Sequence, residues 1–153
     1  MKKQHKTYNR PKNLFDTNRI QSDKDILHKY GLRSKTEIWK AESKISRIRA
    51  QAKKLIIQPE KQKIFFEKLE KMGLIKTSDA SIDTVLSLTK ENLLNRRLQT
   101  IVLKLGLAKT MNESRQLITH RKIKLGETLI TIPSYTVDTD EEGKISKIAA
   151  VSQ

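Results

Sequence analysis

The sequence predicts an α+β protein in which an N-terminal helical domain precedes a helical hairpin and a small, mostly antiparallel sheet. Apolar residues recur at spacings of three and four from about residue 23 to residue 120, which is the period of amphipathic helices. Beyond residue 120 the period falls towards two, which is typical of strands. Glycines and capping patterns divide the helical part into separate segments.

The first 22 residues are polar and basic and contain Pro11. They carry too little apolar surface to offset the entropy of ordering. We interpret residues 1–22 as a basic extended arm that becomes ordered on a polyanionic partner, because basic tails often bind nucleic acid. A disordered tail is the alternative. A short helix should follow from Asp23 to Tyr30, with Gly31 as its left-handed end.

A long helix is predicted from Ser34 to about Ile57, opened by a capping-box pattern of Ser34 and Glu37. Its apolar stripe consists of Ala41, Ile45, Ile48, Ala52 and Leu55. Beside this stripe runs a mostly cationic ridge, formed by Lys40, Lys44, Arg47, Gln51 and Lys54. A solvated face usually interleaves acids with bases. Acids are few here, so we favour phosphate contact by the four cations over plain solvated surface.

Residues 58–88 are predicted to serve packing alone. Pro59 suits the first turn of a third helix, which Gly73 ends. Its buried face should comprise Phe65, Leu69 and Met72. A short helical segment follows at 81–88. We group residues 23–92 as the helical domain.

The hairpin begins with a helix that Thr89 caps and that is expected to run without interruption to Leu105 and Gly106. Its inward side would carry Leu94, Leu98, Ile101, Val102 and Leu105, and its outward side Arg96, Arg97, Thr100 and Lys104. Thr110 and Glu113 repeat the capping pattern and open a second helix that ends near His120. Met111, Ser114 and Ile118 would face the core, and Arg115, Thr119 and Lys122 the outside.

Strands are predicted on either side of a turn at Gly126–Glu127, within residues 123–132. Pro133 should prevent a continuous central strand. Residues 138–144 form a turn, and a last strand is expected from Ile145 to Val151.

The net charge of +15 predicts a polyanionic partner, with nucleic acid first and an anionic membrane surface second. The chain has no Cys, which excludes disulfides, thiol catalysis and Cys-based zinc sites. No segment approaches ~18 uninterrupted apolar residues, and the basic N-terminus lacks the apolar stretch of a secretory signal. We therefore expect a cytoplasmic protein.

Motifs for catalysis, cofactors or metals are absent. There is no Gly-rich phosphate loop and no GxGxxG. The three histidines are far apart; for His120 a contact to RNA or solvent is favoured over a role as a base. Aromatic residues make up only 5% of the chain, so base stacking is not the main binding mode. Phosphate and shape recognition by Lys and Arg on helices suits folded RNA better than duplex DNA. We expect no cofactor, metal or small-molecule substrate.

Four segments of the sequence occur in the following order: YGLRSKTEIWKAE (30–42), RRLQTIVLKLGLAKT (96–110), ESRQLITHRKI (113–123) and IPSY (132–135). Together they resemble the S-four family of small-subunit ribosomal proteins in its archaeal and eukaryotic form. The resemblance implies that residues 93–153 are an S-four-type RNA-binding module with C-terminal strands. The 30–42 block lies outside this module and narrows the likeness to the ribosomal family. The absence of a Cys cluster and of a long basic tail indicates an archaeal-type member.

The resemblance also implies which module residues face RNA. On the first hairpin helix these are Arg96, Arg97, Gln99, Thr100 and Lys104. On the second helix and its end they are Thr110, Ser114, Arg115, Gln116, Thr119, Arg121 and Lys122. Relatives commonly have Ala in place of Ser114 and Gly in place of Arg121, so Arg121 either adds a contact or changes the turn.

The function implied is that of a structural constituent of the small ribosomal subunit. Such a protein binds the 5′ domain of small-subunit rRNA, nucleates assembly, and lies near protein S-five and the mRNA entrance, with a role in translational accuracy. A ribosome-biogenesis RNA-binding factor of the same family is the alternative. An RNA-modifying enzyme is disfavoured, because neither a catalytic acid constellation nor a further domain is present. Membrane binding is disfavoured because few large apolar residues lie outside the core stripes.

Overall fold

The structure is a computed structural model that describes residues 6–76 and 80–148. Its α-helices are α1 (Thr17–Lys29), α2 (Lys35–Leu55), α3 (Gln62–Lys71), α4 (Ile82–Ser87), α5 (Lys90–Asn95), α6 (Leu98–Lys104) and α7 (Met111–Thr119). Two 3-10 helices, η1 (Pro59–Lys61) and η3 (Thr139–Lys144), and three strands, β1 (Ile123–Leu125), β2 (Thr128–Leu129) and β3 (Ile145–Lys147), complete the described fold. The α+β class predicted from the sequence is confirmed.

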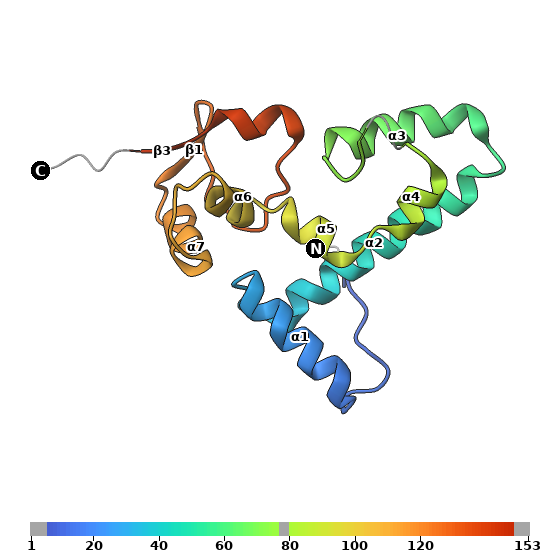
Figure 1. Ribbon diagram of the computed structural model, residues 1–153, viewed down its shortest axis with the longest axis horizontal. Helices are drawn as coiled ribbons and strands as arrows, with labels where there is room; N and C mark the ends of the chain where they lie inside the picture. Colours follow the sequence, from blue (N-terminus) through green and yellow to red (C-terminus); the bar gives the residue numbers. More distant parts are fainter. Residues whose placement is uncertain (1–5, 77–79, 149–153) are drawn as a thin grey trace, which may run out of the picture.

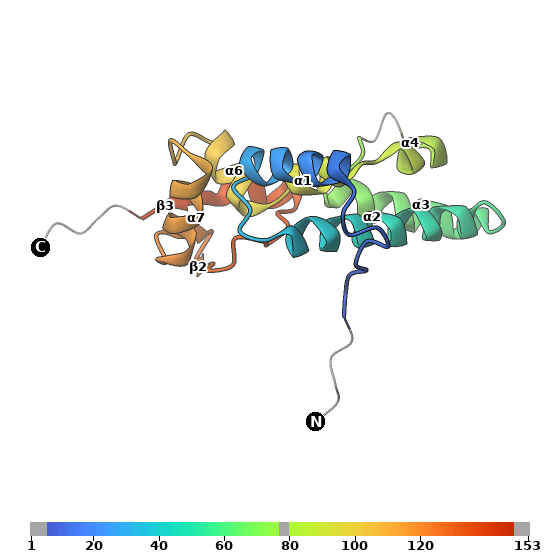
Figure 2. The ribbon, with the colours of Figure 1, turned by 90° about the horizontal axis from the view of Figure 1, so that it is seen from below.

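Two hydrophobic cores organise the chain. The first core is formed by the five helices from α1 through α5. Its most deeply buried side chains include Ile38, Leu69, Val85 and Leu94. The second joins α6, α7 and the sheet around residues such as Leu98, Ile118 and Ile123. Figure 1 shows α6, α7 and the strands gathered on one side and α3 and α4 on the other, with α2 and α5 between them. The molecule is thin when it is viewed from below (Figure 2).

Helix α1 begins at Thr17, where Asp16 caps it by accepting from the Arg19 N–H. The predicted start at Asp23 is therefore wrong, and the last part of the predicted arm is helical. The residues before it lie along α2: the Asn9 N–H donates to Ser43 Oγ at 3.3 Å. The Tyr8 and Trp39 rings are also 6.0 Å apart. Local sequence patterns could not predict these contacts between the N-terminal residues and α2.

Helix α2 matches its prediction closely. Ser34 is its N-cap and accepts from the Thr36 N–H, while the Glu37 carboxylate accepts from the Arg33 N–H at 3.2 Å. Ala41, Ile45, Ile48 and Ala52 are buried as expected, and Leu55 is partly buried. Glu37 reaches back one residue further than in a standard capping box, and its second oxygen is left for another partner.

The continuous helix predicted from Thr89 to Leu105 is wrong. The chain leaves helical geometry at Arg96 and Arg97 and begins α6 at Leu98. The segment after Pro133 is responsible, because its carbonyls satisfy the free N–H groups at the start of α6. Leu98 N donates to Tyr135 O at 2.8 Å and Val137 N to Arg96 O at 2.9 Å. Leu105, predicted to be inward, is 47% exposed.

The sheet has the order β2-β1-β3, and both of its strand pairs are antiparallel in the part of the chain described. Gly126 makes the β1–β2 turn at a φ of 59°. Residues 138–144 are predicted as a turn, and within them Thr139–Lys144 form η3. The last strand is described as Ile145–Lys147, and its predicted end at Val151 lies outside the described residues. Within the described ranges, the helices are too short or too polar to cross a membrane.

Candidate nucleic-acid interface

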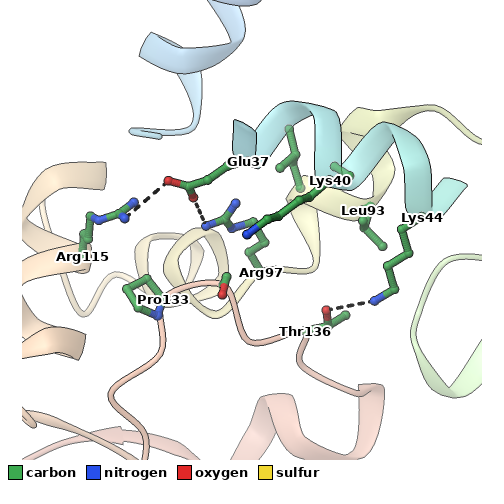
Figure 3. Close-up of a pocket in the computed structure, with 11 residues that line it drawn as sticks. Glu37, Lys40, Lys44, Leu93, Arg97, Arg115, Pro133 and Thr136 are labelled. Carbon is green, nitrogen blue, oxygen red and sulfur yellow. Dashed lines mark hydrogen bonds and ion pairs between the residues drawn. The ribbon is translucent and has the colours of Figure 1, made fainter. Parts of the chain in front are cut away.

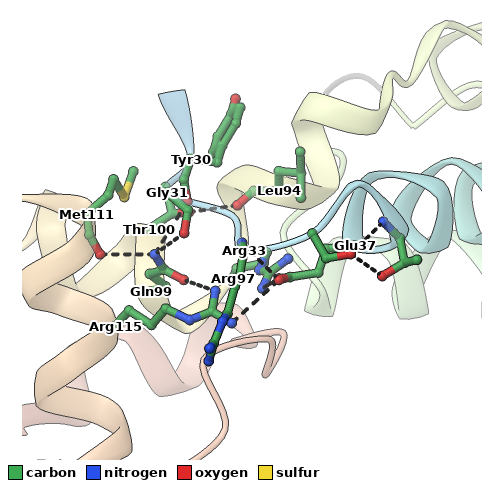
Figure 4. Close-up of polar contacts among 12 residues, drawn as sticks. Tyr30, Gly31, Arg33, Glu37, Leu94, Arg97, Gln99, Thr100, Met111 and Arg115 are labelled. Carbon is green, nitrogen blue, oxygen red and sulfur yellow. Dashed lines mark hydrogen bonds and ion pairs between the residues drawn. The ribbon is translucent and has the colours of Figure 1, made fainter. Parts of the chain in front are cut away.

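Arg97 is buried at the joint between the two cores. Its side chain is only 8% exposed, and its Nη2 donates to Glu37 Oε2 at 2.5 Å. The other Glu37 oxygen accepts from Arg115 Nη2 at 3.4 Å. One carboxylate on α2 thus holds an arginine from the start of α6 and another from α7 (Figure 4). The hairpin is fixed to α2 by a charge-assisted bridge.

Arg96 points to a different partner. Its guanidinium pairs with Glu142 and donates from Nη2 to the Val137 carbonyl at 2.8 Å. It also covers Gly73 at the end of α3, where an added Cβ would lie 2.6 Å from Arg96 Cζ. Thr139 Oγ1 donates to Lys71 O at 3.1 Å in the same region. Arg96 therefore attaches η3 to the end of α3.

The helical period predicted that Arg96, Arg97 and Thr100 face outward, and this prediction is wrong. The same period placed Ser114 in the core, which is confirmed. The family resemblance implied that Gln99 and Ser114 face RNA, but both side chains are buried. Relative exposures are 7% for Arg97, 1% for Gln99, 3% for Thr100 and 0% for Ser114. The side chain of Arg96 is 13% exposed. For Arg96 and Arg97 the reason is the helix break, because these two residues lie between α5 and α6 and not on one continuous helix.

The buried side chains of Gln99, Thr100 and Ser114 each donate hydrogen bonds to backbone carbonyls. Gln99 Nε2 donates to Met111 O at 2.9 Å and to Gly31 O at 3.1 Å, which joins the end of α1 to the start of α7. Thr100 Oγ1 donates to Leu94 O at 2.8 Å, and Ser114 Oγ to Gln99 O at 2.6 Å. Buried polar groups with such partners stabilise a single arrangement of the elements.

The pKa of Glu37 reflects its two arginines. Burial alone would raise this pKa, but the Arg97 hydrogen bond, the charges of Arg97 and Arg115, and the Arg33 N–H together lower it below its ordinary value of 4.5. Glu37 is therefore ionised at neutral pH and remains a partner for both guanidinium groups.

The predicted cations on α2 are accessible. Lys40, Lys44, Arg47 and Lys54 are all exposed, and we call these four residues the α2 ridge. Arg47 Nη2 also donates to Thr7 O at 3.3 Å, and Lys44 Nζ to Thr136 Oγ1 at 3.4 Å. Burial lowers the pKa of Lys44 below 10.5, although the charge of Asp138 opposes this effect.

Six predicted residues of the hairpin are also exposed, and we call them the hairpin face: Lys104, Thr110, Gln116, Thr119, Arg121 and Lys122. Thr110 additionally caps α7 by accepting from the Glu113 N–H. Arg115 is intermediate between the exposed and the buried residues, because its side chain is 27% exposed and also contacts Glu37. Arg121 adopts a φ of 58° at the end of α7, the left-handed conformation that Gly adopts most easily.

Two hollows border these residues. A cleft of about 410 Å³ lies between α2 and residues 133–136, and Glu37, Lys40, Lys44, Arg97 and Arg115 line it (Figure 3). A groove of about 480 Å³ lies between the end of α1 and α7, lined by Arg33, Arg115, Gln116 and Thr119 among others. Sequence reasoning missed Arg33 as a candidate contact, although it lies within the 30–42 block and is exposed.

The described residues hold no group of three or more His, Cys, Asp or Glu side chains that could bind a metal ion. Two of the acids near the interface, Glu37 and Glu142, are paired with Arg97 and Arg96. The chemistry offered by the accessible groups is that of Lys, Arg and hydroxyl donors, which suit phosphate oxygens.

A helical hairpin packed on a short antiparallel sheet, with cations on its free surface, defines an S4-domain protein, and the S4 domain family matches residues 96–142. The match begins at Arg96, where α5 ends. The chain is 44% identical over 149 residues to the small ribosomal subunit protein uS4 of Saccharolobus solfataricus, covering 94% of this chain and 82% of that protein. The uS4 protein of Saccharolobus islandicus strain L.S.2.15 matches with the same identity and coverage. The chain therefore belongs to the uS4 family of small ribosomal subunit proteins.

Proposed function

We propose that the chain is a structural constituent of the small ribosomal subunit, that it acts by binding rRNA rather than by catalysis, and that it works in the cytoplasm. The relatives at 44% identity are named as proteins of that subunit. A net charge of +15 supplies the electrostatic attraction that RNA binding needs.

The observation that carries this proposal is the fixed joint between two accessible cationic surfaces. The α2 ridge belongs to one core and the hairpin face to the other. Glu37, Arg97 and Gln99 hold the two cores together through buried contacts. A rigid separation between cationic surfaces suits folded rRNA, whose helices present phosphates at fixed positions.

The RNA partner proposed is the 5′ domain of small-subunit rRNA, and the chain would nucleate assembly there. Protein S-five and mRNA at the entrance are proposed as further neighbours, with a consequence for translational accuracy. The family resemblance supports these partners. The contacts proposed are the α2 ridge, the hairpin face and Arg115, whereas Arg96, Arg97, Gln99, Thr100 and Ser114 support the frame.

The test is the affinity of the full chain for a 5′-domain rRNA fragment and for a 3′-domain fragment of equal length, measured over a series of KCl concentrations. We expect preference for the 5′-domain fragment. Lys44→Gln and Lys122→Gln should each reduce the log–log salt slope by about 0.7–0.9. Lys63→Gln is the matched control, since Lys63 is exposed on α3 outside both surfaces. Equal affinity for the two fragments would contradict the proposal.

A further inference from the structure

The cleft between α2 and residues 133–136 contains more positive than negative charge. Lys40, Lys44, Arg97 and Arg115 line it, against the single carboxylate of Glu37. In Figure 3 these side chains point into the cleft from α2 on one side and from the hairpin on the other. An anion placed there would meet donors from both cores.

Donor capacity in the cleft is incompletely used. Arg97 Nε is buried and has no hydrogen-bond partner among the residues that the structure describes. Among the described residues, Lys44 hydrogen-bonds to the Thr136 hydroxyl alone, at 3.4 Å, and burial lowers its pKa although the charge of Asp138 opposes this effect. Partly desolvated cations without a full complement of acceptors favour the arrival of an anion.

The two arginines on Glu37 are held unequally. Arg97 is 2.5 Å from the carboxylate with 8% side-chain exposure, whereas Arg115 is 3.4 Å away with 27% exposure. Arg115 has a second long contact, 3.5 Å to Gln99 Oε1. Arg115 can therefore leave Glu37 without disturbing the joint, because Glu37 keeps both Arg97 and the Arg33 N–H.

We propose that the cleft binds a backbone phosphate of RNA, and that Glu37 occupies Arg115 until this phosphate replaces it. The proposal rests on the rRNA-binding function proposed above. Glu37 gives Arg115 a single contact at 3.4 Å, whereas a phosphate can accept two hydrogen bonds from one guanidinium, so the exchange would strengthen the pairing of Arg115. Lys40 and Lys44 would complete the site from α2.

A consequence is that Glu37 weakens RNA binding in this site. It remains beside the bound phosphate as a second negative charge, and the phosphate must displace it from Arg115. Removal of the charge should then strengthen binding, which is the opposite of what a residue that only positions the hairpin would show.

The experiment compares Glu37→Gln with the full wild-type chain on the 5′-domain rRNA fragment, across KCl concentrations. Glutamine keeps the size of the side chain and an acceptor for Arg97. We expect affinity at low salt to rise about three- to tenfold and the salt slope to steepen by up to about 0.9. Glu42→Gln is the matched control, because it removes the same charge from α2 at an exposed position that does not line the cleft. It should change affinity much less.

Arg115→Gln provides the second arm, and it does not depend on the stability of the Glu37 variant. Alone it should weaken binding and flatten the slope by about 0.7–0.9. In its presence Glu37→Gln should give a smaller gain than in the wild type. Unchanged or weaker affinity of a folded Glu37→Gln protein, judged by its thermal unfolding, would overturn the phosphate exchange. So would full affinity of Arg115→Gln.

Failure of the exchange and failure of the proposed function give different results. If the wild type binds the 5′-domain and 3′-domain fragments equally, the proposed function is wrong. If the wild type prefers the 5′-domain fragment while Glu37→Gln matches Glu42→Gln, only the phosphate site is wrong.

Discussion

The guanidinium groups of Arg96 and Arg97 belong to adjacent residues and attach different parts of the molecule. Arg97 binds Glu37 on α2, while Arg96 binds Glu142 in η3 and covers Gly73 after α3. Removal of Arg97 would leave the partly buried Glu37 carboxylate with only the long Arg115 contact and the Arg33 N–H among the described residues, so it would test folding before it tested RNA contact. Accessible cations such as Lys122 are the appropriate probes of binding.

Glu37→Gln should make the free energy of unfolding less dependent on pH in the acidic range. The pKa of Glu37 is lowered in the fold, so its ionised form stabilises the protein, completely above the ordinary value near 4.5 and progressively less as the pH falls through the lower folded value. We expect the variant to lose about 1–2 kcal/mol of unfolding free energy at pH 7. Urea unfolding at pH 7 and pH 3 should show this loss shrinking at the lower pH. A loss of equal size at both pH values would contradict the assignment.

Arg121→Gly should separate stability from binding. Arg121 has a φ of 58°, which costs an L-residue about 1 kcal/mol relative to Gly. We expect Gly to raise the unfolding free energy by about 0.5–1 kcal/mol while weakening binding to the rRNA fragment. Arg121→Lys, which keeps both the charge and the conformational cost, should change neither quantity much. A stabilised Arg121→Gly protein with full affinity would show that this side chain does not contact RNA.

Most helices could be predicted because their signals are local. The stripe on α2, the caps at Ser34 and Thr110, and the left-handed glycines at helix ends depend only on neighbouring residues. The break between α5 and α6 could not, because it depends on carbonyls of Pro133 and Tyr135, more than thirty residues away. The helical period continues through Arg96 and Arg97, so it placed both side chains on the wrong face.

Gly31 and Gly106 provide a matched test of the joint between α1 and α7. Both have positive φ, 54° and 72°. A Cβ at Gly31 would lie 2.7 Å from Met111 Cβ and 3.0 Å from Gln99 Nε2, whereas one at Gly106 would meet nothing within 4 Å. Each Ala variant should lose about 1 kcal/mol to backbone strain. Gly31→Ala should lose about 1–3 kcal/mol more by chemical denaturation, since it separates α1 from α7. Equal losses would contradict this close packing.

Across the whole molecule, the charge balance and the order of motifs indicated the fold class and a polyanionic partner, and the family likeness narrowed that partner to rRNA. They could not indicate which cations remain free. Five predicted contacts support the frame instead, four at the joint between the two cores and Ser114 between α6 and α7: Arg96, Arg97, Gln99, Thr100 and Ser114. The cations of the α2 ridge and the hairpin face are exposed, and none of them forms an ion pair with an acid of the described chain, so they remain available to phosphates.

The most direct test of an rRNA-binding role for these two surfaces is site-specific crosslinking in native small subunits. A photoreactive residue would replace Lys44 in the α2 ridge or Lys122 in the hairpin face, with Lys63 on α3 as the control position, and crosslinked nucleotides would be mapped. We predict that both surface positions crosslink to the 5′ domain of small-subunit rRNA and that the control crosslinks much less. Crosslinks only to other rRNA domains, or none from either surface in subunits that contain the protein, would contradict it.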